Sequence, residues 1–453
     1  MDVCAIILAA GKGSRMKSKY HKGTHKVCGK EIINILIDKL KKCGVDDINL
    51  VVGEYRESLI DVTKDKSVTY SFQEQQLGTG HAVLSAYDFL KNKKGNVLIF
   101  ACDIPLFKEE SINELLSVHF KEENSLTFVT SVLDDALSYG RIIRKDGKVF
   151  CIREAKDCTK EELSINEINT SLYCFKIEDL LDGIKNIKNC NAQNEFYLTD
   201  IIEIFNGKNK KIGTICADKN EVVGVDSRKQ LSYANELLRK EINENHMNNG
   251  VTFLNPESTY IDMDVKIEKD VIIHPNVCIY GSTVIEEDCE IFSNTKIVNS
   301  FIGKNTKIDS SVIYDSKVGE NTNIGPFAYL RPNSIIEDAV KIGDFVEIKN
   351  STIGSGTKIS HLSYVGDAVV GKKCNLGCGI VTVNYDGKDK NKTIIEDECF
   401  VGCNVNLVAP VTVERNSYVA AGTTITEKVD SNSLAIGRCK QTNIENWVIK
   451  KFK

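Results

Sequence analysis

The sequence has few prolines, no long apolar run and no excess of basic residues. Only 6 of its 453 residues are proline, and 58 Lys and Arg are outnumbered by 63 Asp and Glu. A net charge of -5 lacks the basic surplus of a dedicated nucleic-acid binder. The apolar run Val3–Ala10 is much shorter than the roughly 18 residues that a membrane span needs. We therefore expect neither a nucleic-acid partner nor a membrane.

The cysteines lack a pattern as well. The 16 cysteines are scattered from Cys4 to Cys439 without a CxxC pair, and a chain of this length needs no disulfides to stabilise its core. We expect free thiols and a reducing, cytoplasmic compartment. The run Val3–Ala10 follows Asp2 rather than a basic segment, so we interpret it as a first strand and not as a signal peptide.

The first part of the chain alternates short apolar runs with amphipathic stretches, a pattern typical of βαβ units around a mostly parallel sheet. The candidate strands are Val3–Leu8, Ile48–Val52 and Val97–Cys102, and the candidate helices are Ile32–Cys43, Gly80–Lys91 and Ser111–Phe120. This predicts an α/β fold with a Rossmann-like N-terminal domain. Ligands of such a sheet bind beyond the carboxyl ends of the strands.

A single helix is predicted between two domains. Residues 228–248 contain no Gly or Pro, and Leu231, Leu238 and Ile242 recur at helical spacing. We therefore divide the chain into a domain of residues 1–227, a helical linker of residues 228–250 and a second domain of residues 251–453.

Beyond the linker, an aliphatic residue recurs every six positions. The series begins with Ile261, Ile267, Ile273 and Ile279 and continues, with short phase steps, to Ile425. The residue four positions later is compact, as in Val265, Val271, Val277, Thr283, Cys289 and Thr295. A hexapeptide period marks a parallel β-helix, in which the aliphatic residue points inward. Its one large interruption, residues 381–393, predicts a polar loop that reaches toward a ligand or a neighbouring subunit.

A glycine-rich loop follows the first predicted strand. Gly11 and Gly13 fit neither the dinucleotide motif, which needs a third glycine, nor the P-loop motif, but such a loop can present backbone N–H groups to phosphates. Arg15 adds a permanently charged, forked donor. The paired amides of the segment 73–76 suit the edges of a base. Asp103 ends a predicted strand, where it can hold Mg²⁺, although a structural or capping role is commoner for an isolated Asp.

Charged and aromatic side chains interrupt the repeats of the second domain. His361 and Tyr364 lie in the segment HLSYVGD, and His274 is the only other histidine of residues 251–453. A lone histidine is more often structural than catalytic, and charges such as Arg331 and Lys349 on a coil are usually solvated. From the residues alone, both roles stay open.

Together, the motifs of the first domain closely resemble those of sugar-nucleotide pyrophosphorylases. The shared pattern is LAAGxGxRM, followed by a lysine, QxxQLGTGHA and an Asp at a strand end. With the hexapeptide repeats, the whole chain resembles the bacterial bifunctional N-acetylglucosamine-1-phosphate uridyltransferases and glucosamine-1-phosphate N-acetyltransferases. The resemblance implies a left-handed β-helix, a homotrimer and Mg²⁺ as cofactor. It also implies the substrates glucosamine-1-phosphate, N-acetylglucosamine-1-phosphate, UTP and acetyl-CoA.

The resemblance assigns roles to residues of the first domain. In this family, a phosphate oxygen of the sugar phosphate attacks the α-phosphorus of UTP, so no protein nucleophile is required. Asp103 and Asp226 are expected to hold Mg²⁺. The residues expected to contact the nucleotide or the sugar are Leu8, Ala9, Ala10, Gly11, Arg15, Lys22, Gln73, Gly78, Thr79, Gly140, Glu154, Asn169 and Asp226.

Two positions of the first domain depart from the family pattern. The segment HKGTH stands where PKVLH is typical, so His21 replaces the proline that stiffens the lysine loop. Lys22 keeps the expected position, but Lys19 and Lys26 are alternative phosphate partners. Residue 226 is Asp where Asn is usual, and a carboxylate is a stronger Mg²⁺ ligand than an amide.

In the second domain, the resemblance makes His361 the general base, which takes a proton from the 2-amine of the sugar as its nitrogen attacks the acetyl thioester. The residues expected at the sugar phosphate are Arg331, Glu347, Lys349, Tyr364, Asn375 and Lys390; Glu347 would also orient or electrostatically assist the base. The residues expected near acetyl-CoA are Cys378, Asn384, Tyr385, Cys403, Ala421 and Arg438. Cys378, Ile380 and Cys403 depart from the usual Ala, Thr and Ser, so a thiol replaces a hydroxyl as a weaker hydrogen-bonding group. We expect thiol reagents to inhibit the enzyme and acetyl-CoA to protect it.

Other interpretations stay open at this point. The two CxxxC pairs that begin at Cys374 and Cys399 lack a spaced histidine partner, so we do not expect a cysteine metal site. The chain could be a nucleotidyltransferase for another sugar phosphate whose β-helix serves only for assembly, or a non-enzymatic scaffold that senses sugar nucleotides. His361, Asn384 and Lys390 argue against a scaffold, because scaffolding does not need them.

Overall fold

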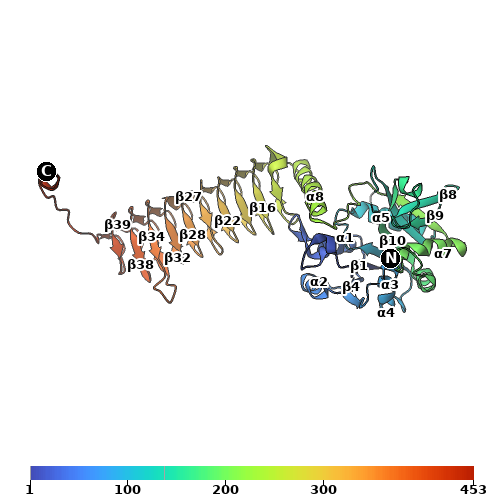
Figure 1. Cartoon of the computed structure of the whole chain (residues 1–453). Helices are drawn as coiled ribbons and strands as arrows, with labels where there is room; N and C mark the ends of the chain where they lie inside the picture. The colour runs from blue at the N-terminus through green and yellow to red at the C-terminus, as the bar shows by residue number, and fades with distance from the viewer. Residues whose placement is uncertain (1, 137, 453) are drawn as a thin grey trace. The chain divides into compact units, whose positions relative to one another are not determined.

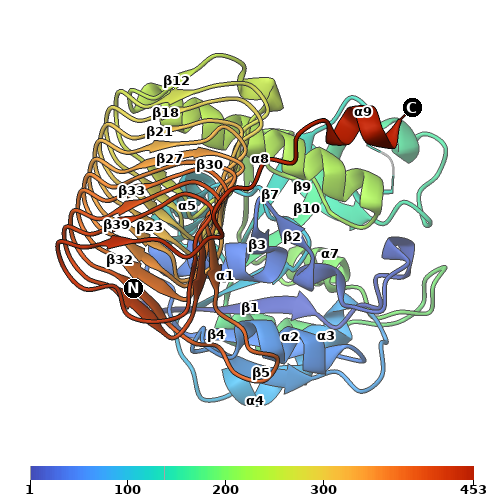
Figure 2. The same ribbon diagram turned by 90° about the vertical axis from the view of Figure 1, so that its left-hand side faces the viewer.

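The computed structural model describes residues 2–136 and 138–452, which form two compact units (Figures 1 and 2). The first unit runs to Leu238 and the second begins at Arg239. The division therefore lies inside helix α8 (Arg228–Asn248), whose bounds agree with the predicted linker helix.

The first unit is built on a mixed sheet, which among the described residues has nine strands in the order β11-β7-β10-β6-β1-β4-β5, with β8 and β9 attached to β10. Strand β1 is parallel to both of its neighbours, whereas β10 is antiparallel to β6 and β7. The predicted Rossmann-like sheet is thus confirmed, with β10 as an antiparallel strand inside it. The strands are β1 (Val3–Ala9), β4 (Ile48–Val52), β5 (Thr69–Phe72), β6 (Asn96–Ala101), β7 (Leu126–Val132), β8 (Arg141–Lys145), β9 (Lys148–Arg153), β10 (Glu167–Lys176) and β11 (Ile212–Cys216).

Helices cover both faces of this sheet. Side chains alternate along a strand, so Ala5 and Ile7 of β1 belong to one hydrophobic core and Cys4 and Ile6 to the other. The first core is closed by α1 (Ile32–Lys42), α2 (Arg56–Thr63) and α5 (Glu109–Lys121). The second is closed by α3 (Thr79–Ser85), α4 (Tyr87–Leu90), α6 (Ile177–Gly183) and α7 (Ile201–Gly207).

One helix prediction is wrong. The segment predicted as a single helix, Gly80–Lys91, consists of α3 and α4, which are separated at Ala86. Ala86 has φ -93° and ψ 16°, outside the α-helical region, and its side chain is buried. The other predicted elements agree with the structure to within two residues at each end.

The second unit is a parallel β-helix, the architecture predicted from the hexapeptide period. Within residues 239–452 it has three parallel sheets of 11, 10 and 9 strands, and each coil contributes one strand to each sheet except at the C-terminal end, where the last coils are incomplete. The sheets begin with β12 (Thr252–Phe253), β13 (Tyr260–Ile261) and β14 (Lys266–Ile267) and end with β41 (Leu434–Ala435), β40 (Thr424–Ile425) and β38 (Val411–Val413). The aliphatic series from Ile261 to Ile425 is buried, as predicted, and Ile313, which the period skips, joins it.

The corners of the coils use residues that tolerate a left-handed backbone. Asn276, Asn294, Asn305 and Asn321 have φ between 54° and 62°, and Asn is among the residues that adopt this conformation most readily. The repeated aliphatic residue and the repeated corner residue together specify one coil after another.

The predicted loop 381–393 is too wide. Val381–Val383 form β34 and Thr393–Ile395 form β35, both paired with neighbouring coils. The excursion is therefore residues 384–392, which a bridge between Tyr385 and Lys390 closes on itself. None of the described helices combines the length and the apolar character needed to cross a membrane.

The buried side chain of His119 should make the first unit less stable in acid. Its ring is buried, with Nδ1 2.9 Å from Thr127 Oγ1 and Nε2 3.0 Å from Asn96 Oδ1. Burial lowers the pKa of His119 to about 4, so the unfolded chain binds more protons than the folded chain as the pH falls below about 6.5. We expect the free energy of unfolding to lose about 2 kcal/mol from this residue between pH 7 and pH 5.

Denaturant unfolding of the wild-type chain and of His119→Gln at both pH values checks this expectation. Glutamine does not titrate, so the variant should lose about 2 kcal/mol less than the wild type. Asp200, whose pKa burial raises to about 6, acts with the opposite sign in both proteins and cancels in the comparison. Equal losses in the two proteins would contradict the assignment.

Candidate active sites

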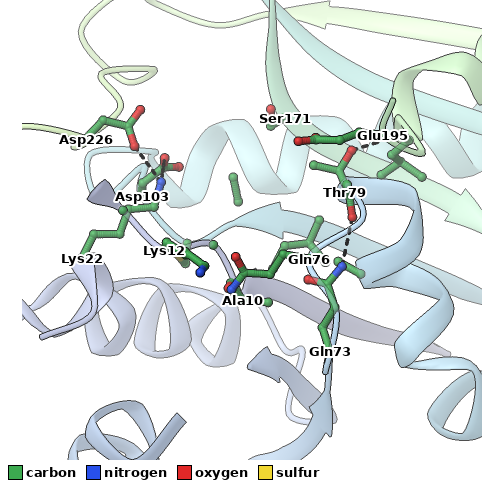
Figure 3. Close-up of a pocket in the computed structure, with 18 of the residues that line it drawn as sticks. Ala10, Lys12, Lys22, Gln73, Gln76, Thr79, Asp103, Ser171, Glu195 and Asp226 are labelled. Atoms are coloured by element: carbon green, nitrogen blue, oxygen red, sulfur yellow. Dashed lines mark hydrogen bonds and ion pairs between the residues drawn. The ribbon is translucent and has the colours of Figure 1, made fainter. Parts of the chain in front are cut away.

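A cavity of about 540 Å³ opens beyond the carboxyl ends of β1 and β6, where the sheet topology predicts a ligand (Figure 3). Of the residues predicted for the first domain's site, all but Ala9 and Gly140 line it. Ala9 is buried in the core. Gly140 lies behind the cavity wall: a Cβ on it would stand 3.4 Å from Glu154 Oε2.

Acidic and basic groups meet at one end of the cavity. Lys22 Nζ lies 2.5 Å from Asp103 Oδ2 and 2.7 Å from Asp226 Oδ1, and Arg15 Nη2 lies 2.8 Å from Asp226 Oδ2. Burial by itself would lower the pKa of Lys22, but the two carboxylates raise it above its ordinary value. Burial would likewise raise the pKa of Asp226, and Lys22 and Arg15 hold it below its usual range. Asp226 is therefore ionised, and both carboxylates pair with the Lys22 ammonium.

The turn that carries Lys22 is held by the residue that replaces the expected proline. His21 is buried, and its Nδ1 accepts a hydrogen bond of 3.0 Å from Gly23 N. Burial lowers the pKa of His21 to about 4, so the ring stays neutral and able to accept. Of the alternative lysines, Lys26 pairs with Glu31 at 3.4 Å and Lys19 lies over the ring of Tyr20. Neither lines the cavity.

Amide groups occupy the opposite end of the cavity (Figure 3). Gln73 is buried and its Nε2 donates to Gly78 O at 3.1 Å, while Gln76 Nε2 donates to Ala10 O at 2.7 Å. Gly78 has φ +110°, and a Cβ there would stand 2.6 Å from Phe196 O, so no other residue fits. The amides of Gln73 and Gln76 are uncharged hydrogen-bonding groups, which suit the edge of a base better than a phosphate.

A third wall of the cavity offers a carboxyl and an amide. Glu154 Oε1 accepts from Thr199 Oγ1 at 3.1 Å, and burial raises the pKa of Glu154. Asn169 Nδ2 donates to Tyr173 OH at 2.7 Å. The sequence did not point to Tyr173 or Thr199, because neither carries a motif and both reach the cavity only through the fold. Other lining residues without a predicted ligand contact include Lys12, Ser171, Glu195 and Leu198.

In the second unit, the predicted residues gather on neighbouring coils. His361 ends β30 (Lys358–His361) and its Nδ1 lies 2.5 Å from Asp344 Oδ1, at the end of β27 (Lys341–Asp344), one coil earlier. The hydrogen bond from His361 lowers the pKa of Asp344. Glu347, which we expected beside the base, pairs instead with Arg331 at 2.8 Å. The sequence analysis did not identify Asp344 as a partner of His361, although the repeat places Asp344 at the equivalent position one coil earlier.

Basic and amide side chains surround Asp367 on the next face. Lys349 Nζ lies 3.6 Å from Asp367 Oδ2, and Asn384 Nδ2 donates to the same oxygen at 2.5 Å. Asn384 Nδ2 also lies 3.5 Å from Tyr364 OH. The adjacent Lys349 lowers the pKa of Lys390, as expected for two ammonium groups held side by side. Such a pair favours an anion.

The residues expected near acetyl-CoA lie on the coils that follow His361. Cys378 comes two residues after Leu376 and Cys403 two after Val401, and Leu376 and Val401 are paired in β33 (Asn375–Leu376) and β36 (Phe400–Val401). Cys378 is half-buried, Cys403 is exposed, and both are free thiols. Arg438 donates through Nη1 to Ala421 O, one coil further on. Tyr385 is exposed in the loop 384–392, and Asn375 pairs with Lys358 and Phe400 in its sheet.

Comparison with known proteins finds a matching family model in each unit. Residues 5–139 match the family model of the MobA-like NTP transferase domain, and residues 312–434 match that of the GMPPB C-terminal domain. A solved Bacillus anthracis structure, described as a glucose-1-phosphate thymidylyltransferase, aligns with 52% of this chain and 94% of its own at 21% identity and a TM-score of 0.44.

Full-length relatives are much closer in sequence. The bifunctional protein GlmU of Clostridium botulinum (strain 657 / Type Ba4) is 55% identical over 99% of this chain and 98% of its own length. Those of Clostridium novyi (strain NT) and Clostridium beijerinckii are 53% and 52% identical over 99% and 100% of this chain, and over 98% and 99% of their own lengths. The chain therefore belongs to the GlmU family of bifunctional enzymes, which make UDP-N-acetylglucosamine through a uridyltransferase and an acetyltransferase activity.

Proposed function

We propose that the two activities are divided along the chain, with uridylyl transfer in residues 1–227, acetyl transfer in residues 251–453 and residues 228–250 as the helix between them. The first assignment is supported by the cavity, which has the amides of Gln73 and Gln76 at one end and the charged groups of Arg15 and Lys22 at the other (Figure 3). The second is supported by the contact between His361 and Asp344, a pairing that solvated surface residues of a scaffold would not need.

At the first site, the uracil of UTP would contact Gln73 and its phosphates would face Arg15 and Lys22. The glycine-rich loop at Gly11 offers backbone N–H groups between these two ends. The sugar of N-acetylglucosamine-1-phosphate would lie at Glu154 and Asn169. The cavity would thus hold the two substrates side by side, which converts an encounter in solution into a positioned reaction.

The reaction at this site is a phosphoryl substitution. A phosphate oxygen of N-acetylglucosamine-1-phosphate forms a bond to the α-phosphorus of UTP, and the bond from that phosphorus to the bridging oxygen of the β-phosphate breaks. Pyrophosphate leaves with the electron pair. Arg15 and Lys22 would offset the negative charge as it moves onto pyrophosphate.

We propose Asp103 and Asp226 as Mg²⁺ ligands. Both carboxylates converge on a single cation, the Lys22 ammonium, and hard oxygen atoms suit Mg²⁺. In the described part of the chain no cluster of three or more His, Cys, Asp or Glu could hold a metal, so water and phosphate oxygens would complete the ligand set, as is usual for Mg²⁺. When bound, Mg²⁺ would supply positive charge beside the transferring phosphoryl group.

At the second site, we propose His361 as the general base for acetyl transfer. The nitrogen of the glucosamine-1-phosphate 2-amine attacks the carbonyl carbon of the acetyl thioester, the amine gives a proton to His361 Nε2, and the carbon–sulfur bond breaks to release CoA as a thiol. Asp344 accepts from His361 Nδ1 and so leaves Nε2 free to accept. Lys349 and Lys390 would bind the sugar phosphate.

We propose a homotrimer, and an apolar ridge on the second unit supports it. Phe327, Phe345 and Leu362 stand at the same corner of three successive coils, and the stacked rings of the two phenylalanines have centroids 5.4 Å apart. Each side chain is more than half exposed, and φ is 59°, 54° and 47°. Bulky residues are strained in this conformation. We infer that burial of these side chains against another copy of the chain offsets the strain. His361 directly precedes Leu362, so that copy would lie beside the acetyl site.

Replacing Phe345 with Asn tests the ridge. Asn tolerates the left-handed corner, so the coil should stay intact while the apolar contact is lost. In sedimentation velocity, we expect the main species to shift from trimer toward monomer. We expect acetyl transfer to fall about tenfold or more, because the second copy would no longer stand beside the acetyl site. Ala339→Asn, at another exposed corner with φ 57°, is the matched control and should change neither. A monomeric Phe345→Asn variant with full acetyl transfer would contradict the shared site.

Product analysis tests the function as a whole. The purified chain is incubated with glucosamine-1-phosphate, acetyl-CoA, UTP and Mg²⁺, and free CoA, pyrophosphate and UDP-N-acetylglucosamine are measured. We expect all three, with CoA released first. Pyrophosphate only from added N-acetylglucosamine-1-phosphate would mean that this chain has lost acetyl transfer.

We further propose the cytoplasm as its location, since all 16 cysteines are free thiols.

A further inference from the structure

We propose that the Lys22 ammonium and the divalent cation compete for the same pair of carboxylates, so that Lys22 has to leave Asp103 and Asp226 before the metal ion can be held. This inference rests on the proposed metal site and assigns to Lys22 a positioning role beyond contact with phosphate. The evidence is that one nitrogen contacts an oxygen of each carboxylate, at 2.5 and 2.7 Å.

The geometry leaves no room for both cations. A Mg²⁺ ion bound to both carboxylates at about 2.1 Å would stand where the Lys22 nitrogen stands. The side chains of Lys22, Asp103 and Asp226 are only 15%, 14% and 22% exposed, so solvent screens the repulsion between two adjacent cations only weakly. Binding of the metal therefore requires Lys22 to move.

The two carboxylates are held in place more firmly than the lysine. Val225 N donates to Asp103 O at 2.8 Å, which fixes the backbone before Asp226 to the end of β6. Asp226 is also held by Arg15 from its other oxygen. Metal binding should therefore displace the flexible lysine side chain rather than the carboxylates.

The Lys22 ammonium can turn toward the glycine-rich loop when it leaves the carboxylates. Its aliphatic stem lies against the glycine-rich loop: a Cβ built on Gly13 would stand 3.4 Å from Lys22 Cβ and 3.7 Å from Lys22 Cδ. Rotation of the outer side-chain torsions would turn the ammonium from the carboxylates toward this loop, where we place the phosphates. His21 caps the turn of Lys22 and holds its backbone during that rotation. Binding of the metal ion would therefore move the positive charge of Lys22 to the triphosphate in the same step.

Calorimetric titration with Mn²⁺ alone, without nucleotide, tests the competition. We expect Lys22→Met to bind Mn²⁺ about tenfold or more tightly than the wild type, because a competing charge has gone. Lys22→Arg keeps that charge and should stay close to the wild type. Lys12→Met is the matched control for a general loss of charge, since Lys12 lies in the nearby glycine-rich loop, is 62% exposed and pairs with Glu54. Its affinity should change less than twofold.

A measurement on the wild-type chain covers the case in which Lys22→Met does not fold. In NMR spectra of lysine labelled with ¹³C at Cε, the signal missing from Lys22→Arg identifies Lys22. That signal should move on Mg²⁺ addition, over the concentration range in which a calorimetric titration of the same protein with Mg²⁺ saturates. Equal affinities of Lys22→Met and Lys12→Met, or an unmoved Lys22 signal at saturating Mg²⁺, would overturn the competition. Absence of metal binding in every variant would instead reject the proposed metal site.

Discussion

Replacing His361 with Ala should reduce acetyl transfer by about 10³-fold, the usual contribution of a general base, and leave uridylyl transfer unchanged. The side chain of His361 is 59% exposed and pairs with Asp344 on the surface of the coil, so its removal should not disturb the β-helix core. Release of CoA from acetyl-CoA and glucosamine-1-phosphate measures the first activity. Pyrophosphate release from UTP and N-acetylglucosamine-1-phosphate measures the second.

His274→Ala is the matched control, because His274 is the other histidine of residues 251–453. It lies 3.2 Å from Glu290 Oε1 and stacks on Phe292, away from the predicted acetyl site. This variant should keep both activities. Asp344→Asn should lower the rate of acetyl transfer without changing the Michaelis constant for glucosamine-1-phosphate, because Asp344 would orient the proposed base rather than bind the sugar. Full acetyl transfer by His361→Ala would reject the assignment.

Replacing Asp103 with Ala should reduce uridylyl transfer and leave acetyl transfer unchanged. The variant loses one of the two proposed Mg²⁺ ligands and the partner that holds Lys22 at 2.5 Å. Loss of the metal's charge would remove several kcal/mol of transition-state stabilisation, or roughly 10³-fold in rate. We expect pyrophosphate release to fall by that factor, while CoA release stays at the wild-type level.

An exposed aspartate of the same unit provides the comparison for this variant. Asp134 is 93% exposed and pairs with Lys219 at 2.8 Å, so Asp134→Ala should keep both activities. Asp103→Ala that loses acetyl transfer as well would show that the two sites are not independent. Asp103→Ala with wild-type pyrophosphate release would show that the metal, if required, is held elsewhere.

Much of the fold could be predicted because its signals are local and repeated. In the second unit, an inward aliphatic residue every six positions leaves a coil as the only way to bury each of them, and Ile261 to Ile425 are buried accordingly. In the first unit, the short strand after Asp2 and the glycine-rich loop placed the cavity at the end of β1. The helix break at Ala86 was missed, since residues 81–91 contain no Pro or Gly to signal it.

The sequence by itself thus determined two architectures and the helix between them, and it predicted many of the residues that line the cavity of the first unit. Only the tertiary structure decided which of those side chains meet. Lys22 contacts Asp103 and Asp226 across 81 and 204 residues, and the contact of His361 with Asp344 rather than Glu347 depends on the register between coils. The ridge of Phe327, Phe345 and Leu362 has the same origin. The physical reason is that periodicity specifies which face of an element is buried, whereas the partner of a polar side chain depends on distances between segments that are remote in the chain.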